Sequence, residues 1–226
     1  MTATATARYG AWPGSTPEWQ VPGGPTPGPG RPERRPAVSE AGVAPWLEQR
    51  MFEQQLVAVS GPVTAELASR VGSQLMTLDA LAGPRGGRIT MQVSSVDGDL
   101  SAAFALMDVL DLMRTPVRAV ALGTVGGAAL GVYAAATERV AYPHARFVVS
   151  EPRVDRLAGT ADQVTLAAGA HLRLLEDLAV RLAERTGRTR AQIERELSDR
   201  HEMSATEAVE YGLVERLTSD DSGPAR

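Results

Sequence analysis

The chain contains neither cysteine nor lysine: none of its 226 residues is Cys, and its 23 basic residues are all arginine. Without cysteine there is no disulfide framework, no thiolate zinc site and no thiol nucleophile. Without lysine there is no Schiff-base lysine, no Ser-Lys dyad and no P-loop lysine. The formal net charge of −4 gives the chain no attraction to a phosphate backbone. The composition therefore predicts no DNA or RNA partner.

Long apolar runs are also missing. No segment approaches the roughly 18 apolar residues that a membrane-spanning helix needs. The opening MTATATARYGAWPG lacks the basic and apolar regions of a secretory signal. We therefore expect a cytoplasmic protein that makes no contact with a membrane.

Proline is concentrated at the start of the chain. Nine of the fifteen prolines and all three tryptophans fall within the first 46 residues. A segment of this composition buries too little apolar surface to fold alone. Residues 1–44 are therefore expected to form a disordered Pro/Gly-rich tail. Residues 45–218 provide enough chain for one domain, and residues 219–226 are expected to be a flexible C-terminal tail.

Strand-like and helix-like patterns alternate after the tail. β-rich runs predict strands at 56–60, 88–93, 117–122, 139–142 and 146–150. Apolar residues at helical spacing predict helices over 64–82, from Leu100 to a stop at Arg114-Thr115-Pro116, and through the small residues of 126–134. This alternation favours an α/β domain with a largely parallel sheet.

The second half of the domain is helical. A long helical pattern runs from Thr160 to Arg185, and Gly187 suits its C-terminal cap. Capping boxes that begin at Thr189 and at Ser204 predict two shorter helices. A long helix beyond an α/β core is most simply an assembly element, because its second apolar flank needs a partner.

The C-terminal run RTGRTRAQIERELSDRHEMSATEAVEYGLVERL resembles the handle and last segment of the proteolytic subunit of the Clp protease, ClpP, and the match extends upstream to about Leu56. The resemblance implies a ClpP/crotonase-type fold with a parallel sheet core and a protruding handle helix at about 160–186. It also implies ClpP paralogue subunits as partners in a homo- or hetero-tetradecamer, together with a Clp-family ATPase unfoldase. ATP would be used by that unfoldase, so this chain is expected to need no cofactor.

The family uses a Ser-His-Asp triad, and none of its three residues is present here. The serine position carries Gly127, the histidine position carries Ser150, and the aspartate position carries Arg200. Glycine has no Oγ for attack, and serine does not act as a general base at neutral pH. We therefore predict no catalytic residues in this chain.

The oxyanion loop departs from the family as well. The family's Asn-Ser-Pro-Gly-Gly corresponds to Ser94-Ser95-Val96-Asp97-Gly98, so Val96, Asp97 and Gly98 form a degenerate binding loop. The Asp97 carboxylate would repel the anion that such a loop stabilises. The normally Gly-rich strand after the family's histidine reads RVDRLAG here, at 153–159. Together these losses predict a ring-forming subunit that is catalytically inactive.

Two alternatives stay open. The first is an active Clp serine endopeptidase with a displaced triad. Its candidate serines and histidines are Ser94, Ser95, Ser101, Ser150, His144, His171 and His201.

Three scattered histidines without a paired ligand motif predict no metal site.

The second alternative is a crotonase-like acyl-CoA enzyme. The stretch from Gly126 to Gly131 resembles the glycine-rich stretch of crotonases, which binds a thioester oxyanion. Those enzymes use carboxylates as acid and base. Here no Asp or Glu lies between Thr124 and Thr137, and Glu151 stands alone near the second position.

Overall fold

The computed structural model describes residues 45–82, 87–152 and 159–218. The tails predicted at 1–44 and 219–226, and all of the 153–159 stretch except Gly159, lie outside the described residues. In the part of the chain that is described, no helix combines the length and apolar character needed to cross a bilayer.

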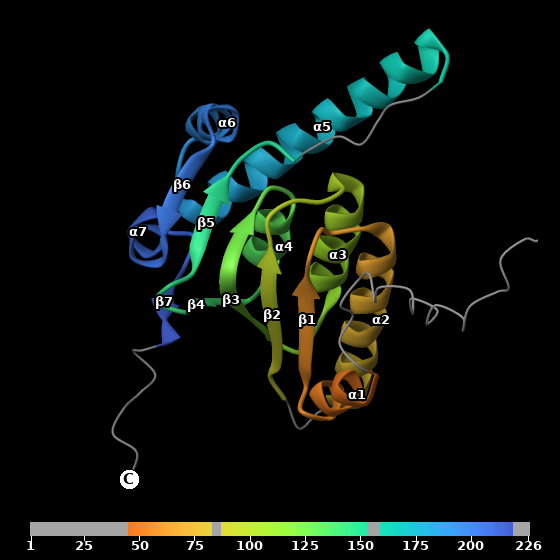
Figure 1. The fold of residues 1–226 in the computed structure, drawn as a ribbon, viewed down its shortest axis with the longest axis vertical. Helices are drawn as coiled ribbons and strands as arrows, with labels where there is room; N and C mark the ends of the chain where they lie inside the picture. The colour runs from red at the N-terminus through yellow and green to blue at the C-terminus, as the bar shows by residue number, and fades with distance from the viewer. Residues whose placement is uncertain (1–44, 83–86, 153–158, 219–226) are drawn as a thin grey trace, which may run out of the picture. The chain divides into compact units, whose positions relative to one another are not determined.

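Helices and strands alternate through the described part of the chain (Figure 1). The helices are α1 (Pro45–Glu53), α2 (Ala65–Ala82), α3 (Leu100–Leu112), α4 (Ala129–Ala135), α5 (Ala161–Thr186), α6 (Arg190–Asp199) and α7 (Ala205–Tyr211). The strands are β1 (Leu56–Ser60), β2 (Ile89–Ser95), β3 (Val117–Gly126), β4 (Glu138–Ala141), β5 (Arg146–Val149), β6 (His201–Ser204) and β7 (Arg216–Leu217). The predicted fold class, an α/β domain with a ClpP-type parallel sheet and a protruding helix, is confirmed.

Strand β3 is the central strand of the sheet, and on one side it pairs with two different strands, β4 and β5. The main path runs β1-β2-β3-β4-β7, and all of its pairs are parallel. The first half of β3 pairs with β4 as far as Ala121, whereas Thr124–Gly126 pairs with β5. β5 then pairs with β6 in antiparallel fashion. The sheet therefore divides at its upper end, and the second branch carries the segment that follows α6.

The core forms where the predicted apolar faces meet the sheet. In α2 the residues at helical spacing, Leu67, Val71, Leu75 and Leu78, are all buried. In α4 every residue is buried, because small side chains let this helix pack closely against its neighbours. Its aromatic side chain, Tyr133, packs beside Phe147 and donates its hydroxyl hydrogen to the Val140 carbonyl at 3.0 Å.

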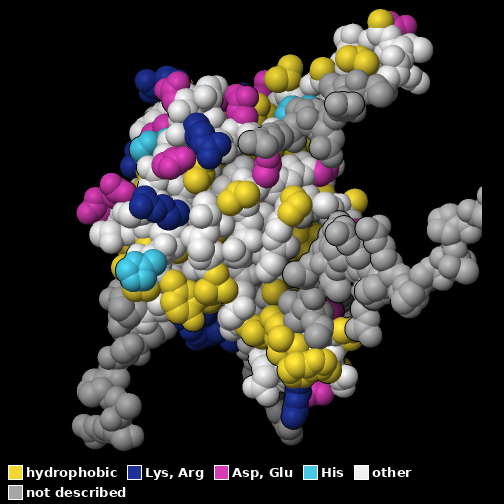
Figure 2. Space-filling model, in the orientation of Figure 1, with side chains coloured by type: hydrophobic (Ala, Val, Ile, Leu, Met, Phe, Trp, Pro, Cys, Tyr) yellow, Lys and Arg dark blue, Asp and Glu magenta, His cyan; other side chains and the backbone are white. Residues whose placement is uncertain are grey.

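Helix α5 projects beyond the rest of the domain (Figure 1). Its buried residues, Leu178, Ala179 and Leu182, all lie in its second half. Leu166 and Leu172 are 72% and 58% exposed, and hydrophobic side chains are visible along the projecting end in Figure 2. The apolar face that the sequence predicts along the whole helix is therefore covered only in part within a single chain.

Candidate functional site

The sheet brings Gly127, Ser150 and Arg200, the three positions that the sequence analysis predicts for the triad, to one end of the β3–β5–β6 ladder. The Gly127 N–H donates to the Val148 carbonyl at 3.4 Å, and Ser150 lies two residues beyond Val148. In the antiparallel pair, Val149 lies opposite His201, which directly follows Arg200. Segments that are far apart in the sequence thus converge at one site, with no side chain at Gly127, a hydroxyl at Ser150 and a guanidinium at Arg200.

The loop after β2 lies against Gly127. A Cβ atom added to this buried glycine would lie 3.2 Å from the Val96 carbonyl oxygen and 3.3 Å from Oδ1 of Asp97. Gly127 also has φ +52°, in the left-handed region that disfavours a side chain. The position therefore lacks a nucleophile, and the neighbouring loop leaves little space for one.

Hydrogen bonds hold that loop in place. The Asp97 carbonyl accepts from the Val63 N–H at 3.0 Å and from the Ser95 hydroxyl at 3.1 Å. The Asp97 carboxylate accepts from the Gly98 N–H at 2.9 Å. The Asp97 carboxylate thus occupies the Gly98 N–H within the loop predicted to be the degenerate oxyanion loop, and it places a negative charge close to Gly127.

Arg200, and Glu151 next to Ser150, interact with other side chains. Arg200 is exposed, ends α6 in a left-handed conformation and forms an ion pair with Glu202 at 3.2 Å. The residue after Ser150, Glu151, is tied to α6, because its carboxylate accepts from the Ser198 hydroxyl at 3.0 Å. An arginine cannot stabilise a protonated imidazole as an aspartate does.

The serines and histidines considered for a displaced triad are spread over several elements. Ser95 is buried and already donates to the Asp97 carbonyl. Ser101 and His144 are exposed, and His171 lies on the projecting helix α5. Among the residues that the structure describes, no hydrogen bond joins a serine hydroxyl to a histidine, and no group of three His, Cys, Asp or Glu side chains is placed to hold a metal ion.

An aromatic stack beside the ladder was not predicted. Arg188 lies 3.8 Å above the Tyr211 ring, and the His201 ring stacks on Tyr211 with centroids 6.1 Å apart. The Tyr211 hydroxyl contacts Glu196. Burial and this carboxylate raise the pKa of Tyr211 far above its ordinary value, so the phenol stays neutral. Tyr211 belongs to the Glu-Tyr-Gly-Leu motif, but the motif gives no sign of its two stacking partners.

The stack borders an open hollow of about 390 Å³ on the α7 side. Its lining is of mixed charge and consists of Arg188, His201, Glu202, Met203, Glu207, Glu210 and Tyr211. Acidic and basic side chains are interspersed on this side of the molecule in Figure 2. Three carboxylates and one guanidinium line the hollow, so acidic side chains outnumber basic ones along the wall.

The predicted capping box at Ser204 is confirmed and controls the charge of Glu207. The Glu207 carboxylate accepts from the Ser204 N–H and hydroxyl, both at 2.7 Å. These bonds, the backbone one first, lower the pKa of Glu207 from its ordinary value of 4.5. The lowered pKa adds stability above about pH 4.5, and this stability is lost as the pH falls through the folded-state pKa.

We therefore expect Glu207→Gln to lower the free energy of unfolding at about pH 7 and to have a smaller effect as the pH falls below about 4.5. The neutral amide replaces a charged acceptor at the higher pH, whereas the carboxylate loses its charge as the pH falls through its lowered pKa. Urea denaturation of the two chains at about pH 7 and below about pH 4.5 measures the change. Glu210→Gln, in the same helix, is the matched control. A stability difference that does not depend on pH would contradict this role for the carboxylate.

Comparisons with known proteins agree with the architecture. A family model described as Clp protease matches residues 42–221. The chain is 28% identical over 168 residues to the ATP-dependent Clp protease proteolytic subunit 1 of Thermobifida fusca (strain YX), covering 74% of this chain and 75% of that protein. It is 29% identical over 170 residues to the protein of the same name from Bifidobacterium longum (strain NCC 2705), covering 74% and 72%.

Proposed function

The chain belongs to the Clp protease family, and we propose that within this family it is a ring subunit that does not hydrolyse peptides. The observation that carries the proposal is the contact between Gly127 and the Asp97 loop, where a side chain at position 127 would meet Oδ1 of Asp97 at 3.3 Å. Acyl transfer requires a nucleophile, a base and donors for the oxyanion at one place. Gly127, Ser150 and Arg200, the residues that the resemblance assigns to the triad positions, cannot fill these roles.

Assembly is the role that the remaining architecture supports. Helix α5 presents Leu166 and Leu172 to solvent on a segment that projects from the domain. Burial of such side chains against another subunit would stabilise a complex. We propose that the chain co-assembles with active ClpP paralogues in a hetero-tetradecamer in the cytoplasm, with a homo-tetradecamer of this chain as the alternative assembly. A Clp-family ATPase unfoldase would use the ATP and deliver the substrate.

Labelling with a serine-reactive fluorophosphonate, followed by intact mass spectrometry, tests the loss of activity. We expect no adduct on the folded chain, with an active Clp peptidase as the positive control. We also expect none on Gly127→Ser, because Ser150 and Arg200 cannot activate the new hydroxyl. A stoichiometric adduct on the unmodified chain would contradict the proposal and favour the displaced-triad enzyme, and the modified serine would identify its nucleophile.

Co-expression with an active paralogue tests the assembly. A tag on this chain is expected to recover the paralogue in a single high-mass species by size exclusion. Purified chains that never enter a mixed ring would refute co-assembly. A thermal shift with a CoA thioester would instead support the crotonase-like alternative, for which Glu151 is the candidate carboxylate.

A further inference from the structure

Strand β1 is the outermost strand of the sheet on the α2 side (Figure 1). It pairs with β2, in parallel, over all five of its residues. Two hydrogen bonds at the ends of this ladder fix which backbone groups of the strand face β2. The Thr90 N–H donates to the Gln55 carbonyl at 2.8 Å, and the Gly61 N–H donates to a carbonyl of β2 at 3.1 Å. Because the bonded residues of a parallel strand alternate, the odd-numbered residues from Gln55 to Gly61 face β2.

The even-numbered residues of β1 direct their backbone groups away from the sheet. Leu56, Ala58 and Ser60 each turn an N–H and a carbonyl outward, at a repeat of two residues. Within the described ranges 45–82, 87–152 and 159–218, no hydrogen bond reaches these groups. Leu56 and Ala58 are half-buried, and Ser60 is exposed. The edge therefore offers three donors and three acceptors to an added strand.

The sequence of β1 leaves this edge open to pairing. The strand reads LVAVS, and it contains neither the proline nor the charged side chains by which edge strands commonly avoid pairing. Its flanks are uncharged as well, because no Asp, Glu or Arg lies between Glu53 and Glu66. A charged segment placed along this edge would lose hydration without gaining a partner of opposite sign. The charge pattern therefore selects an uncharged occupant.

We propose that the β1 edge binds an extended, uncharged segment of an unfolded polypeptide as an added strand. An extended backbone fits the edge because its own N–H and carbonyl groups repeat every second residue along one side. Backbone hydrogen bonds supply the affinity in this mode of recognition, so no particular side-chain sequence is required. The inference rests on the backbone of β1 alone. Its failure would leave the proposed loss of catalysis unchanged, and the reverse also holds.

Titration of the full-length chain with dye-labelled acetyl-Thr-Val-Thr-Val-Thr-amide tests the proposal. We expect a saturable rise in fluorescence anisotropy. Residue-resolved hydrogen exchange locates the peptide: the amides of Leu56, Ala58 and Ser60 are expected to exchange rapidly in the free chain and more slowly in the complex. The control peptide has the same sequence with every backbone nitrogen methylated. It cannot donate to the outward carbonyls, and we expect it not to bind.

Ala58→Pro is the decisive variant. Proline removes the outward N–H of residue 58 and is tolerated at an edge position that faces solvent, whereas the bonds to β2 come from Val57 and Val59. We expect the affinity for the peptide to fall about tenfold or more. The matched control is Ala58→Val, which keeps the N–H and is expected to bind as the unmodified chain does. If Ala58→Pro unfolds, the methylated peptide still tests the edge.

Three results would overturn the proposal. The first is equal affinity for the two peptides, and the second is equal affinity of folded Ala58→Pro and Ala58→Val for the unmethylated one. The third is an Ala58 amide whose exchange slows as the concentration of the chain rises without peptide, because a second copy would then occupy the edge.

Discussion

Replacing Gly98 with alanine is expected to lower the free energy of unfolding by about 3 kcal/mol, because the new methyl group meets backbone that cannot move aside. A Cβ atom at this position would lie 2.4 Å from the Val63 nitrogen and 2.7 Å from its oxygen. Val63 and Gly98 form a bridge between the segments after β1 and β2. The Asp99 N–H donates to the Val63 carbonyl at 2.8 Å, and Asp99 in turn caps α3. The substitution therefore strains the loop that carries Asp97.

Urea denaturation followed by circular dichroism measures this change. The matched control is Gly61→Ala, since Gly61 also has a positive φ, +78°, but no atom within 4 Å of its added Cβ. The control is expected to cost about 1 kcal/mol, from backbone conformation alone. Equal losses for the two variants would contradict a specific steric role for the Gly98 contact.

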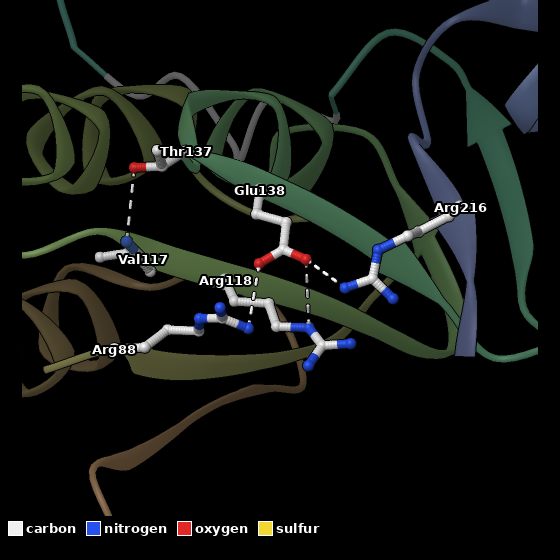
Figure 3. Close-up of polar contacts among 6 residues, drawn as sticks. All are labelled: Arg88, Val117, Arg118, Thr137, Glu138 and Arg216. Atoms are coloured by element: carbon white, nitrogen blue, oxygen red, sulfur yellow. Dashed lines mark hydrogen bonds and ion pairs between the residues drawn. The ribbon is translucent and has the colours of Figure 1, made fainter. Parts of the chain in front are cut away.

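Glu138→Gln is expected to lower the free energy of unfolding by about 2 kcal/mol, because it removes the carboxylate that Arg88, Arg118 and Arg216 share (Figure 3). The Glu138 side chain is 24% exposed, so part of the repulsion is screened and the loss is smaller than at a fully buried pair. Glutamine keeps the size of the side chain but only one acceptor oxygen. Repulsion among Arg88, Arg118 and Arg216 then opposes the packing of β7 against β4.

Denaturation at low and high salt separates charge from packing. The deficit of Glu138→Gln is expected to shrink as salt is added, since mobile ions screen the arginines. Glu53→Gln, which removes one partner of an exposed ion pair with Arg50 in α1, should change stability by less than about 0.5 kcal/mol. A deficit that is independent of salt would indicate lost shape complementarity instead of charge repulsion.

Most helices and strands could be predicted because their residues carry a strong periodic pattern. Leu67, Val71 and Leu75 show the pattern in α2, and all three are buried. Strand β6 was missed because only Met203 among its residues is buried, so no alternation is visible. Helix α1 was missed for a similar reason, since none of its residues is buried.

The boundary between β3 and α4 shows a different limit. The small residues of 126–134 suit a helix, but β3 continues to Gly126 and α4 begins at Ala129. Pairing of Gly126 with Val148 of β5 decides the extra strand residues. Tertiary pairing of this kind overrides a local preference, and a single segment carries no sign of it.

The candidate site could be anticipated in its residues but not in its geometry. The resemblance to ClpP assigns Gly127, Ser150 and Arg200 to the triad positions. That assignment stays a prediction, although the β3–β5–β6 ladder gathers all three at one end. The approach of Asp97 to Gly127 depends on a loop about thirty residues away, which no local motif encodes. The Arg188 and His201 contacts with Tyr211 were unpredictable for the same reason.

The uneven burial of α5 also determines how its two halves fluctuate. Leu178 and Leu182 fix the second half to the core, so its opening requires much of the domain to unfold. The half that contains Leu166 has no buried side chain, and its backbone hydrogen bonds break by local fraying at low cost. Contact with a second subunit would extend the cooperative unit along the whole helix. The protection of these amides from solvent exchange would then report assembly directly.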